Sequence, residues 1–130
     1  MSVNNKIAIF PGTFDPFTLG HHDIVTRGLK IFDKIFIAIG NNPKKDRYFN
    51  VNLIKEKIDN LYKDKSKINV INYNKLTASL AKDLNSNIET VFLITSPKLA
   101  PISSTIIRDV IRYGGDINKY LPYKINLDEK

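Results

Sequence analysis

The stretch KIAIFPGTFDPFTLGHHD, residues 6–23, decides the fold class of this chain. It begins with a short apolar run, KIAIF, that passes at once into Pro-Gly, which is typical of a buried strand ending in a turn. Loop residues continue to Gly20, and residues 22–32 then carry apolar side chains at a helical period. The stretch therefore predicts a strand, a loop and a helix in that order.

The alternation of strand and helix continues along the chain. Further strands are predicted at residues 34–39, 68–73 and 90–95, and further helices at residues 50–61, 76–84 and 103–113. Asn50 is expected to cap the second helix, and Gly114-Gly115 to end the last one. Strands that alternate with helices pair in parallel through right-handed crossovers, so the sequence predicts an α/β fold with a doubly wound parallel sheet.

The length of 130 residues is close to the common size of one domain, and no repeat or linker divides the chain. We therefore expect a single domain over residues 1–130, with a frayed polar tail at 123–130. The chain has no cysteine, which excludes a disulfide scaffold and thiolate metal sites. Its two histidines, His21 and His22, are adjacent, so we expect no protein-held metal.

The composition bounds the partners. No apolar run reaches the ~20 residues of a membrane helix, and the start lacks a secretory signal, so we expect a cytoplasmic protein that does not enter a membrane. The net charge of +7 fits either a lysine-rich coding bias or a field that attracts phosphates. No helix-turn-helix pattern or aromatic-rich basic stripe accompanies the charge, so nucleic acid is not an expected partner.

In a doubly wound sheet, ligands bind outside the carboxyl ends of the strands. The loop at residues 11–23 supplies hydroxyls at Thr13 and Thr18 and places His21 at the amino end of a helix, where backbone N–H groups and the helix dipole favour an anion. The alternative is a proline-rich connection in which the histidine only caps the helix.

Two other segments follow strands. PISSTIIRD, residues 101–109, opens a helix with three hydroxyl side chains, which either cap it or, with Lys98, Arg108 and Arg112, cradle a pyrophosphate. NNPKKDRYF, residues 41–49, carries basic side chains that form a solvated face or hold a phosphate.

PGTFDPFTLGHHD resembles the signature of the bacterial phosphopantetheine adenylyltransferases, nucleotidyltransferases with a (H/T)-x-G-H motif, here residues 18–21. ISSTIIRDVIRYGGDINKYLP, residues 102–122, is similar to the carboxyl-terminal part of the same family. The likeness extends over residues 6–84 and 89–122. It implies a Rossmann-like nucleotidyltransferase fold.

The resemblance also implies a reaction of coenzyme A biosynthesis, in which ATP and 4′-phosphopantetheine give dephospho-coenzyme A and pyrophosphate with Mg²⁺. It makes His21 the catalytic residue and leaves His22 a structural one. The residues it implies for ATP binding are Thr13, Phe14, His21, Leu99, Ala100, Pro101, Ile102, Ser103, Ser104 and Thr105. Those it implies for phosphopantetheine are Thr13, Lys45 and Thr77. The family assembles as hexamers, so a homo-oligomer is expected.

The chain departs from the family between Asn87 and Glu89, where about thirty residues of the family pattern are absent. They include an Arg-Gly-Leu-Arg turn and a Tyr-Glu pair. Either the protein is shortened, and Lys98, Arg108 or another basic group substitutes, or the sequence omits a segment. A real deletion puts activity and hexamer assembly in doubt.

Two other functions stay open from sequence alone. One is a cytidylyltransferase for a small phosphorylated alcohol, which shares GTFD, GH and IST-type motifs. The other is a non-catalytic nucleotide-binding remnant, which the missing arginines favour.

Overall fold

The computed structural model describes residues 5–41, 46–73, 93 and 95–129. Its elements are β1 (Ile7–Gly12), α1 (Leu19–Gly28), β2 (Lys34–Gly40), α2 (Val51–Leu61), β3 (Ile68–Tyr73) and α4 (Ser104–Arg112). The short 3-10 helices η1 (Asn118–Tyr120) and η2 (Leu127–Glu129) follow. The helix predicted at residues 76–84 and most of the strand predicted at 90–95 lie outside the described residues.

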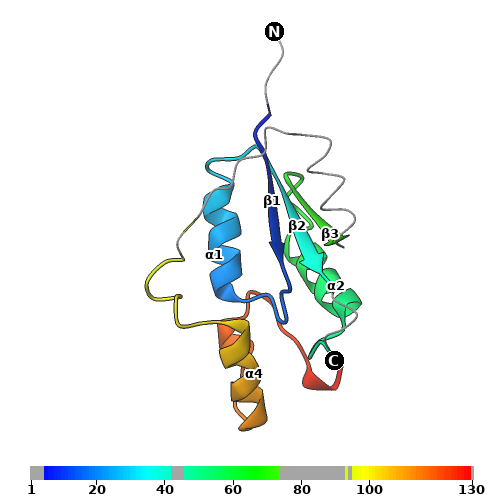
Figure 1. Cartoon of the computed structure of the whole chain (residues 1–130), viewed down its shortest axis with the longest axis vertical. Helices are drawn as coiled ribbons and strands as arrows, with labels where there is room; N and C mark the ends of the chain where they lie inside the picture. The colour runs from blue at the N-terminus through cyan, green and yellow to red at the C-terminus, as the bar shows by residue number, and fades with distance from the viewer. Residues whose placement is uncertain (1–4, 42–45, 74–92, 94, 130) are drawn as a thin grey trace.

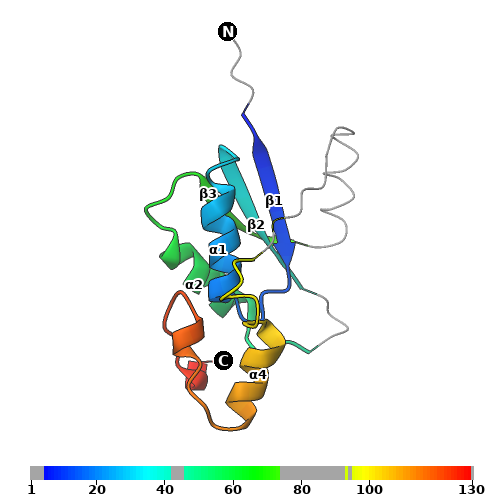
Figure 2. The ribbon, with the colours of Figure 1, turned by 90° about the vertical axis from the view of Figure 1, so that its left-hand side faces the viewer.

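The described strands form a parallel sheet in the order β1-β2-β3. Ile7 pairs with Lys34, and Ile35 pairs with Ile68, which fixes the register of both pairs. Right-handed crossovers between neighbouring strands place both connecting helices on one face of the sheet, and α1 and α2 lie together in front of it in Figure 2. The predicted α/β fold with a parallel sheet is confirmed.

The core lies between the sheet and these two helices. The central strand contributes Ile35, Ile37 and Ile39, while α2 contributes Ile54 and Ile58, all of them buried. β2 lies between β1 and β3, and its residues Ile35, Ile37, Ala38 and Ile39 are all buried, in line with its nearly continuous apolar sequence. Figure 1 shows α4 beyond the carboxyl ends of β1 and β2, where the sequence predicts ligand binding.

The helix boundaries follow their caps. Asn50 caps α2 through its side chain, as predicted, and Ser103 caps α4. Gly114 has φ +76°, the left-handed conformation predicted for the end of that helix. The first helix was predicted at residues 22–32 but begins at Leu19 and ends at Gly28. Its true start is set by Thr18, which periodicity alone does not reveal.

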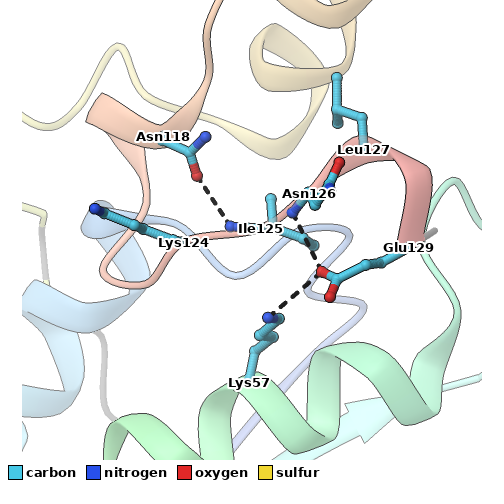
Figure 3. Close-up of a pocket in the computed structure, with 7 residues that line it drawn as sticks. All are labelled: Lys57, Asn118, Lys124, Ile125, Asn126, Leu127 and Glu129. Atoms are coloured by element: carbon cyan, nitrogen blue, oxygen red, sulfur yellow. Dashed lines mark hydrogen bonds and ion pairs between the residues drawn. The ribbon is translucent and has the colours of Figure 1, made fainter.

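The chain end differs from the predicted frayed tail. Ile125 is only 5% exposed and belongs to the core, because Leu121 and Tyr123 bring the segment back against the apolar interior. Lys57 on α2 pairs with Glu129 at 3.5 Å. A cavity of about 580 Å³ lies between this segment and α2 (Figure 3).

Candidate active site

The loop that follows β1 has a tightly determined shape. Phe14 adopts φ +48° and is buried, an uncommon conformation for a residue with a side chain. A Cβ atom on Gly12 would lie 2.7 Å from the Phe14 ring, so only glycine leaves room for that ring. The Phe14 ring packs edge-on against Phe10 and Phe17, with ring centroids 5.2 and 5.3 Å apart.

His21 completes this aromatic cluster and also caps α1. Its Nδ1 accepts a hydrogen bond from the Thr18 backbone N–H at 2.9 Å, and its own N–H donates to the Thr18 hydroxyl. Because Nδ1 acts as an acceptor, the proton of the neutral ring must sit on Nε2. Among the described residues Nε2 has no hydrogen-bond partner. This arrangement leaves one N–H donor for a ligand.

The surroundings of His21 keep its ring neutral. The ring centroid lies 5.0 Å from that of Phe14 and 5.3 Å from that of Phe17. Burial lowers the pKa of His21 from 6.5 to about 4, since the apolar walls penalise the imidazolium. At neutral pH the side chain is therefore a neutral hydrogen-bond donor.

This lowered pKa predicts a pH-dependent stability. Below pH 6.5 the unfolded chain protonates His21 while the folded chain does not, so the contribution is complete above pH 6.5 and lost as the pH falls toward 4. Between pH 7.5 and 5 the loss attributable to His21 is about 2 kcal/mol. Denaturant unfolding of the wild type and of His21→Asn at both values measures it. An equal loss in both proteins contradicts the lowered pKa.

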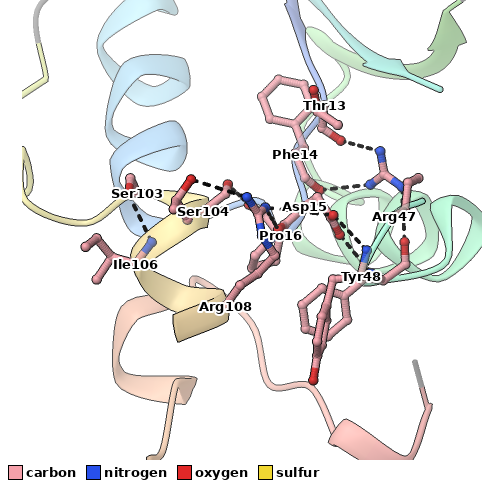
Figure 4. Close-up of polar contacts among 12 residues, drawn as sticks. Thr13, Phe14, Asp15, Pro16, Arg47, Tyr48, Ser103, Ser104, Ile106 and Arg108 are labelled. Atoms are coloured by element: carbon pink, nitrogen blue, oxygen red, sulfur yellow. Dashed lines mark hydrogen bonds and ion pairs between the residues drawn. The ribbon is translucent and has the colours of Figure 1, made fainter. Parts of the chain in front are cut away.

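The start of α4 is joined to the loop after β1. The Ser104 hydroxyl donates to the Pro16 carbonyl at 2.8 Å, and Arg108 Nη1 donates to the Asp15 carbonyl at 2.7 Å. A Cβ on Gly20 would lie 3.5 Å from the Ile102 carbonyl oxygen. The two motifs that the sequence singles out therefore meet at one edge of the sheet (Figure 4).

The remaining predicted site residues are placed as follows. Thr13 is exposed, and Ser103 uses its hydroxyl oxygen to accept the Ile106 N–H at 3.2 Å. Thr105 Oγ1 accepts a hydrogen bond from Arg108 Nη2 at 3.2 Å. The turn that leads into α4 holds Leu99, Ala100, Pro101 and Ile102. Lys45 and Thr77 lie outside the described residues.

The charged residues divide between the loop and the surface. Arg108 contacts the loop, but Arg112 pairs with Asp109 at 3.2 Å and its side chain is 70% exposed. Lys98 is also exposed. The two arginines that were predicted to act together thus have different partners in this structure.

A link between α1 and the turn before α4 was not predicted. Asp23 Oδ2 accepts hydrogen bonds from the Ser96 hydroxyl at 2.9 Å and from its N–H at 3.2 Å, and it pairs with Arg27. Burial alone raises the pKa of Asp23, but the bonds from Ser96 and the Arg27 charge outweigh it and hold that pKa below its ordinary value. This carboxylate keeps the amino end of α1 beside the turn.

The sequence also gives no sign of a polar network under the loop. The buried Asp15 carboxylate accepts the backbone N–H groups of Tyr48 and Phe49, both at 2.8 Å. Arg47 donates to four backbone carbonyls, two of them in residues 13–14 (Figure 4). Arg47 is therefore half-buried, uses four of its five N–H donors, and is not part of a solvated face.

His22 has the structural surroundings expected for it. Its Nδ1 lies 2.7 Å from the Tyr62 hydroxyl, and the two rings stack with centroids 5.6 Å apart. Burial lowers the pKa of His22, although the Asp23 charge opposes this. The contact ties α1 to Tyr62, the residue that caps the end of α2.

Comparison with known proteins gives the class of enzyme to which this chain belongs, the nucleotidyltransferases. The profile of the family described as cytidylyltransferase-like matches residues 9–94. A putative nicotinate-nucleotide adenylyltransferase from Vibrio parahaemolyticus superposes with a TM-score of 0.59 at 20% identity, covering 90% of this chain and 93% of that one. A bifunctional NMN adenylyltransferase/ADP ribose pyrophosphatase from Francisella tularensis gives 0.65 at 16% identity, covering 93% of this chain and 45% of that one. The Rossmann-like nucleotidyltransferase fold is confirmed.

Sequence relatives narrow the class. The phosphopantetheine adenylyltransferase of Cytophaga hutchinsonii is 44% identical over 149 residues, with 93% of this chain and 99% of that protein covered. The phosphopantetheine adenylyltransferase of Flavobacterium johnsoniae is 41% identical over 142 residues, with 88% and 93% covered. The chain belongs to the phosphopantetheine adenylyltransferase family.

The alignment with the Cytophaga relative also bears on the shortfall. Its 149 positions take in 93% of this chain, or about 121 residues, so about 28 positions of that relative have no counterpart here. This agrees with the shortfall predicted from sequence. The junction at Asn87–Glu89 lies outside the described residues.

In the part of the chain that the structure describes, no helix has the length and apolar character needed to cross a membrane.

Proposed function

We propose that this chain transfers the adenylyl group of ATP to 4′-phosphopantetheine in coenzyme A biosynthesis. A phosphate oxygen of phosphopantetheine attacks the α-phosphorus, the bond from that phosphorus to the β-phosphate oxygen breaks, and pyrophosphate leaves. The single observation that carries the proposal is the meeting of the two family motifs, through the Ser104–Pro16 and Arg108–Asp15 hydrogen bonds, at the edge where His21 caps α1.

His21 is the proposed catalytic residue. Its Nε2–H is a neutral donor that stabilises the charge growing on the α-phosphate oxygens during attack. The aromatic walls lower the local dielectric and strengthen that hydrogen bond. No proton needs to move to or from His21, because the nucleophile is already an ionised phosphate. Positioning and electrostatic stabilisation carry the reaction.

The binding roles follow the family motifs. The exposed Thr13 serves both substrates, and Phe14 helps to hold the nucleotide. The turn and helix start at residues 99–105 take the ATP phosphates, with hydroxyl donors from Ser103 and Thr105, while the Ser104 hydroxyl holds this segment against Pro16. Lys45 holds the phosphate of phosphopantetheine, and Thr77 lines the channel for its pantetheine arm.

Magnesium enters with the nucleotide. Among the described residues no group of three His, Asp or Glu side chains could hold a metal ion. The carboxylate oxygens of Asp15, in the loop itself, already accept two backbone N–H groups. We propose that Mg²⁺ reaches the site bound to the ATP phosphates.

Three further features are proposed on the resemblance and the composition. The chain forms one domain, acts in the cytoplasm and assembles with further copies of itself. Sedimentation of the purified chain tests the assembly. We expect a multimer, and a monomer at every concentration would contradict the proposed assembly.

Pyrophosphate release tests the reaction itself. The purified chain is supplied with ATP or CTP, and with 4′-phosphopantetheine or glycerol phosphate as acceptor. We expect turnover with ATP and phosphopantetheine. Turnover with CTP and glycerol phosphate would indicate the cytidylyltransferase alternative, while ATP binding without turnover would indicate a non-catalytic remnant.

Lys45→Ala is expected to weaken phosphopantetheine selectively. Removing one charge-assisted contact to a phosphate raises the Michaelis constant for that substrate by about tenfold, at about 1.4 kcal/mol per factor of ten. The constant for ATP stays near its wild-type value. Steady-state kinetics with each substrate varied in turn measures both, and an unchanged constant for phosphopantetheine contradicts the role of Lys45.

A further inference from the structure

We propose that Arg47 is a positioning residue for adenylyl transfer. It fixes the backbone conformation of Thr13 and Phe14, and thereby the position of the Phe14 ring that packs on His21. The inference rests on the proposed function for its kinetic consequences. The contacts that Arg47 makes with the loop can be tested without turnover.

Arg47 binds carbonyl oxygens from three separate segments. Nη1 donates to the Thr13 carbonyl at 2.7 Å and to the Gly40 carbonyl at 3.1 Å. Nη2 donates to the Phe14 carbonyl at 3.2 Å, and Nε to the Phe49 carbonyl at 3.1 Å. The side chain thus joins the loop after β1 to the end of β2 and to the entry of α2. Figure 4 shows its contacts with Thr13 and Phe14.

The number of donors decides between positioning and phosphate binding. A guanidinium has five N–H groups in a fixed fork, and four hydrogen bonds to backbone carbonyls are already present. Little capacity is left for a substrate phosphate. The effect of Arg47 on the reaction therefore passes through the backbone that it holds.

The positive charge of Arg47 is opposed by the carboxylate of Asp15. Burial lowers the pKa of Arg47, Asp15 opposes this, and the nearby Arg108 adds to it. The side chain stays charged at neutral pH, because an arginine pKa starts so high. Asp15 thus lies between two arginines, one that holds the loop from the β2 side and one that holds it from α4.

The backbone that Arg47 holds, at Thr13 and Phe14, determines the surroundings of His21. Phe14 has φ +48°, a conformation that persists only where neighbours impose it. Its ring lies edge-on to the His21 ring, with centroids 5.0 Å apart. Releasing these carbonyls therefore disturbs the ring that packs on His21 and the backbone of Thr13.

The kinetic test compares Arg47→Lys, Arg47→Ala and the control Lys55→Arg, since the Lys55 side chain forms an exposed pair with Asp59 on α2. A lysine keeps the charge but cannot reach four carbonyls, so Arg47→Lys is expected to lower kcat by about tenfold, in line with a small misplacement of reacting groups. Because the donor of His21 acts mainly in the transition state, the Michaelis constants for both substrates change by less than about threefold. Guanidinium ion restores part of the kcat of Arg47→Ala, and ethylammonium ion does not.

A second measurement does not depend on turnover. In ¹⁵N-labelled protein, Arg47→Lys is expected to shift the amide resonances of Phe14 and Asp15, because the Thr13 and Phe14 carbonyls lose their donor, and Lys55→Arg is expected to leave them in place. Unshifted amides overturn the proposal, as does wild-type kcat in Arg47→Lys, which would mean that charge alone suffices. If the wild type turns over no substrate pair, the proposed function fails, and the amide shifts still decide whether Arg47 positions the loop.

Discussion

Replacing His21 by asparagine is expected to lower kcat by about 10²–10³-fold, the effect of removing one preorganised donor from a developing oxyanion. Asparagine keeps an oxygen near the position of Nδ1, so the Thr18 N–H retains its acceptor and α1 its cap. It removes the Nε2–H donor. Because the charge that this donor meets is largest in the transition state, the affinity for ATP should change by less than about threefold.

The matched control is His22→Asn, one residue further along the same helix. His22 bonds to Tyr62 and has no part in the proposed reaction, so this variant should keep its kcat. Pyrophosphate release measures turnover, and calorimetric titration with ATP measures affinity. A near-normal kcat in His21→Asn, or an equal loss in His22→Asn, would remove His21 from its proposed role.

The fold was predictable because local signals agree with the tertiary structure. The strands at residues 34–39 and 68–73 and the Asn50 cap all lie where periodicity and turn residues place them. The predicted first helix extends too far because the apolar period continues into Leu29 and Phe32. The helix itself begins after the Thr18 cap and ends at Gly28. The tail was misjudged because the burial of Ile125 depends on partners distant in sequence.

Only the motif residues of the site could be predicted from the sequence. Sequence likeness indicates His21 and the hydroxyls at 103–105 but gives no support for Arg47, which stands in a charged run that is ordinarily solvated. Its acceptors at Thr13, Phe14 and Gly40 come from other segments of the chain, and backbone carbonyls leave no mark in sequence. The Asp23–Ser96 contact spans 73 residues and is hidden for the same reason.

Asp15 joins these segments and is the residue whose loss should destabilise the fold most. Its carboxylate is buried, accepts the N–H groups of Tyr48 and Phe49 at 2.8 Å each, and lies 3.8 Å from Arg108 Nη1. Both bonds are charge-assisted, and they satisfy two backbone donors beside a residue that is only 6% exposed. The carboxylate is also the charge that lies between Arg47 and Arg108.

Asp15→Asn is expected to lower the free energy of unfolding by about 2–4 kcal/mol. The new amide group would turn a donor toward one of two backbone donors, and both arginines would lose their counter-charge. Thermal and denaturant unfolding measure the loss, which corresponds to a decrease in Tm of about 10 °C for a chain of this size. Asp59→Asn is the control, because Asp59 forms an exposed pair with Lys55 on α2 and should cost less than about 0.5 kcal/mol. Equal stability of the two variants would mean that the loop does not depend on the buried carboxylate.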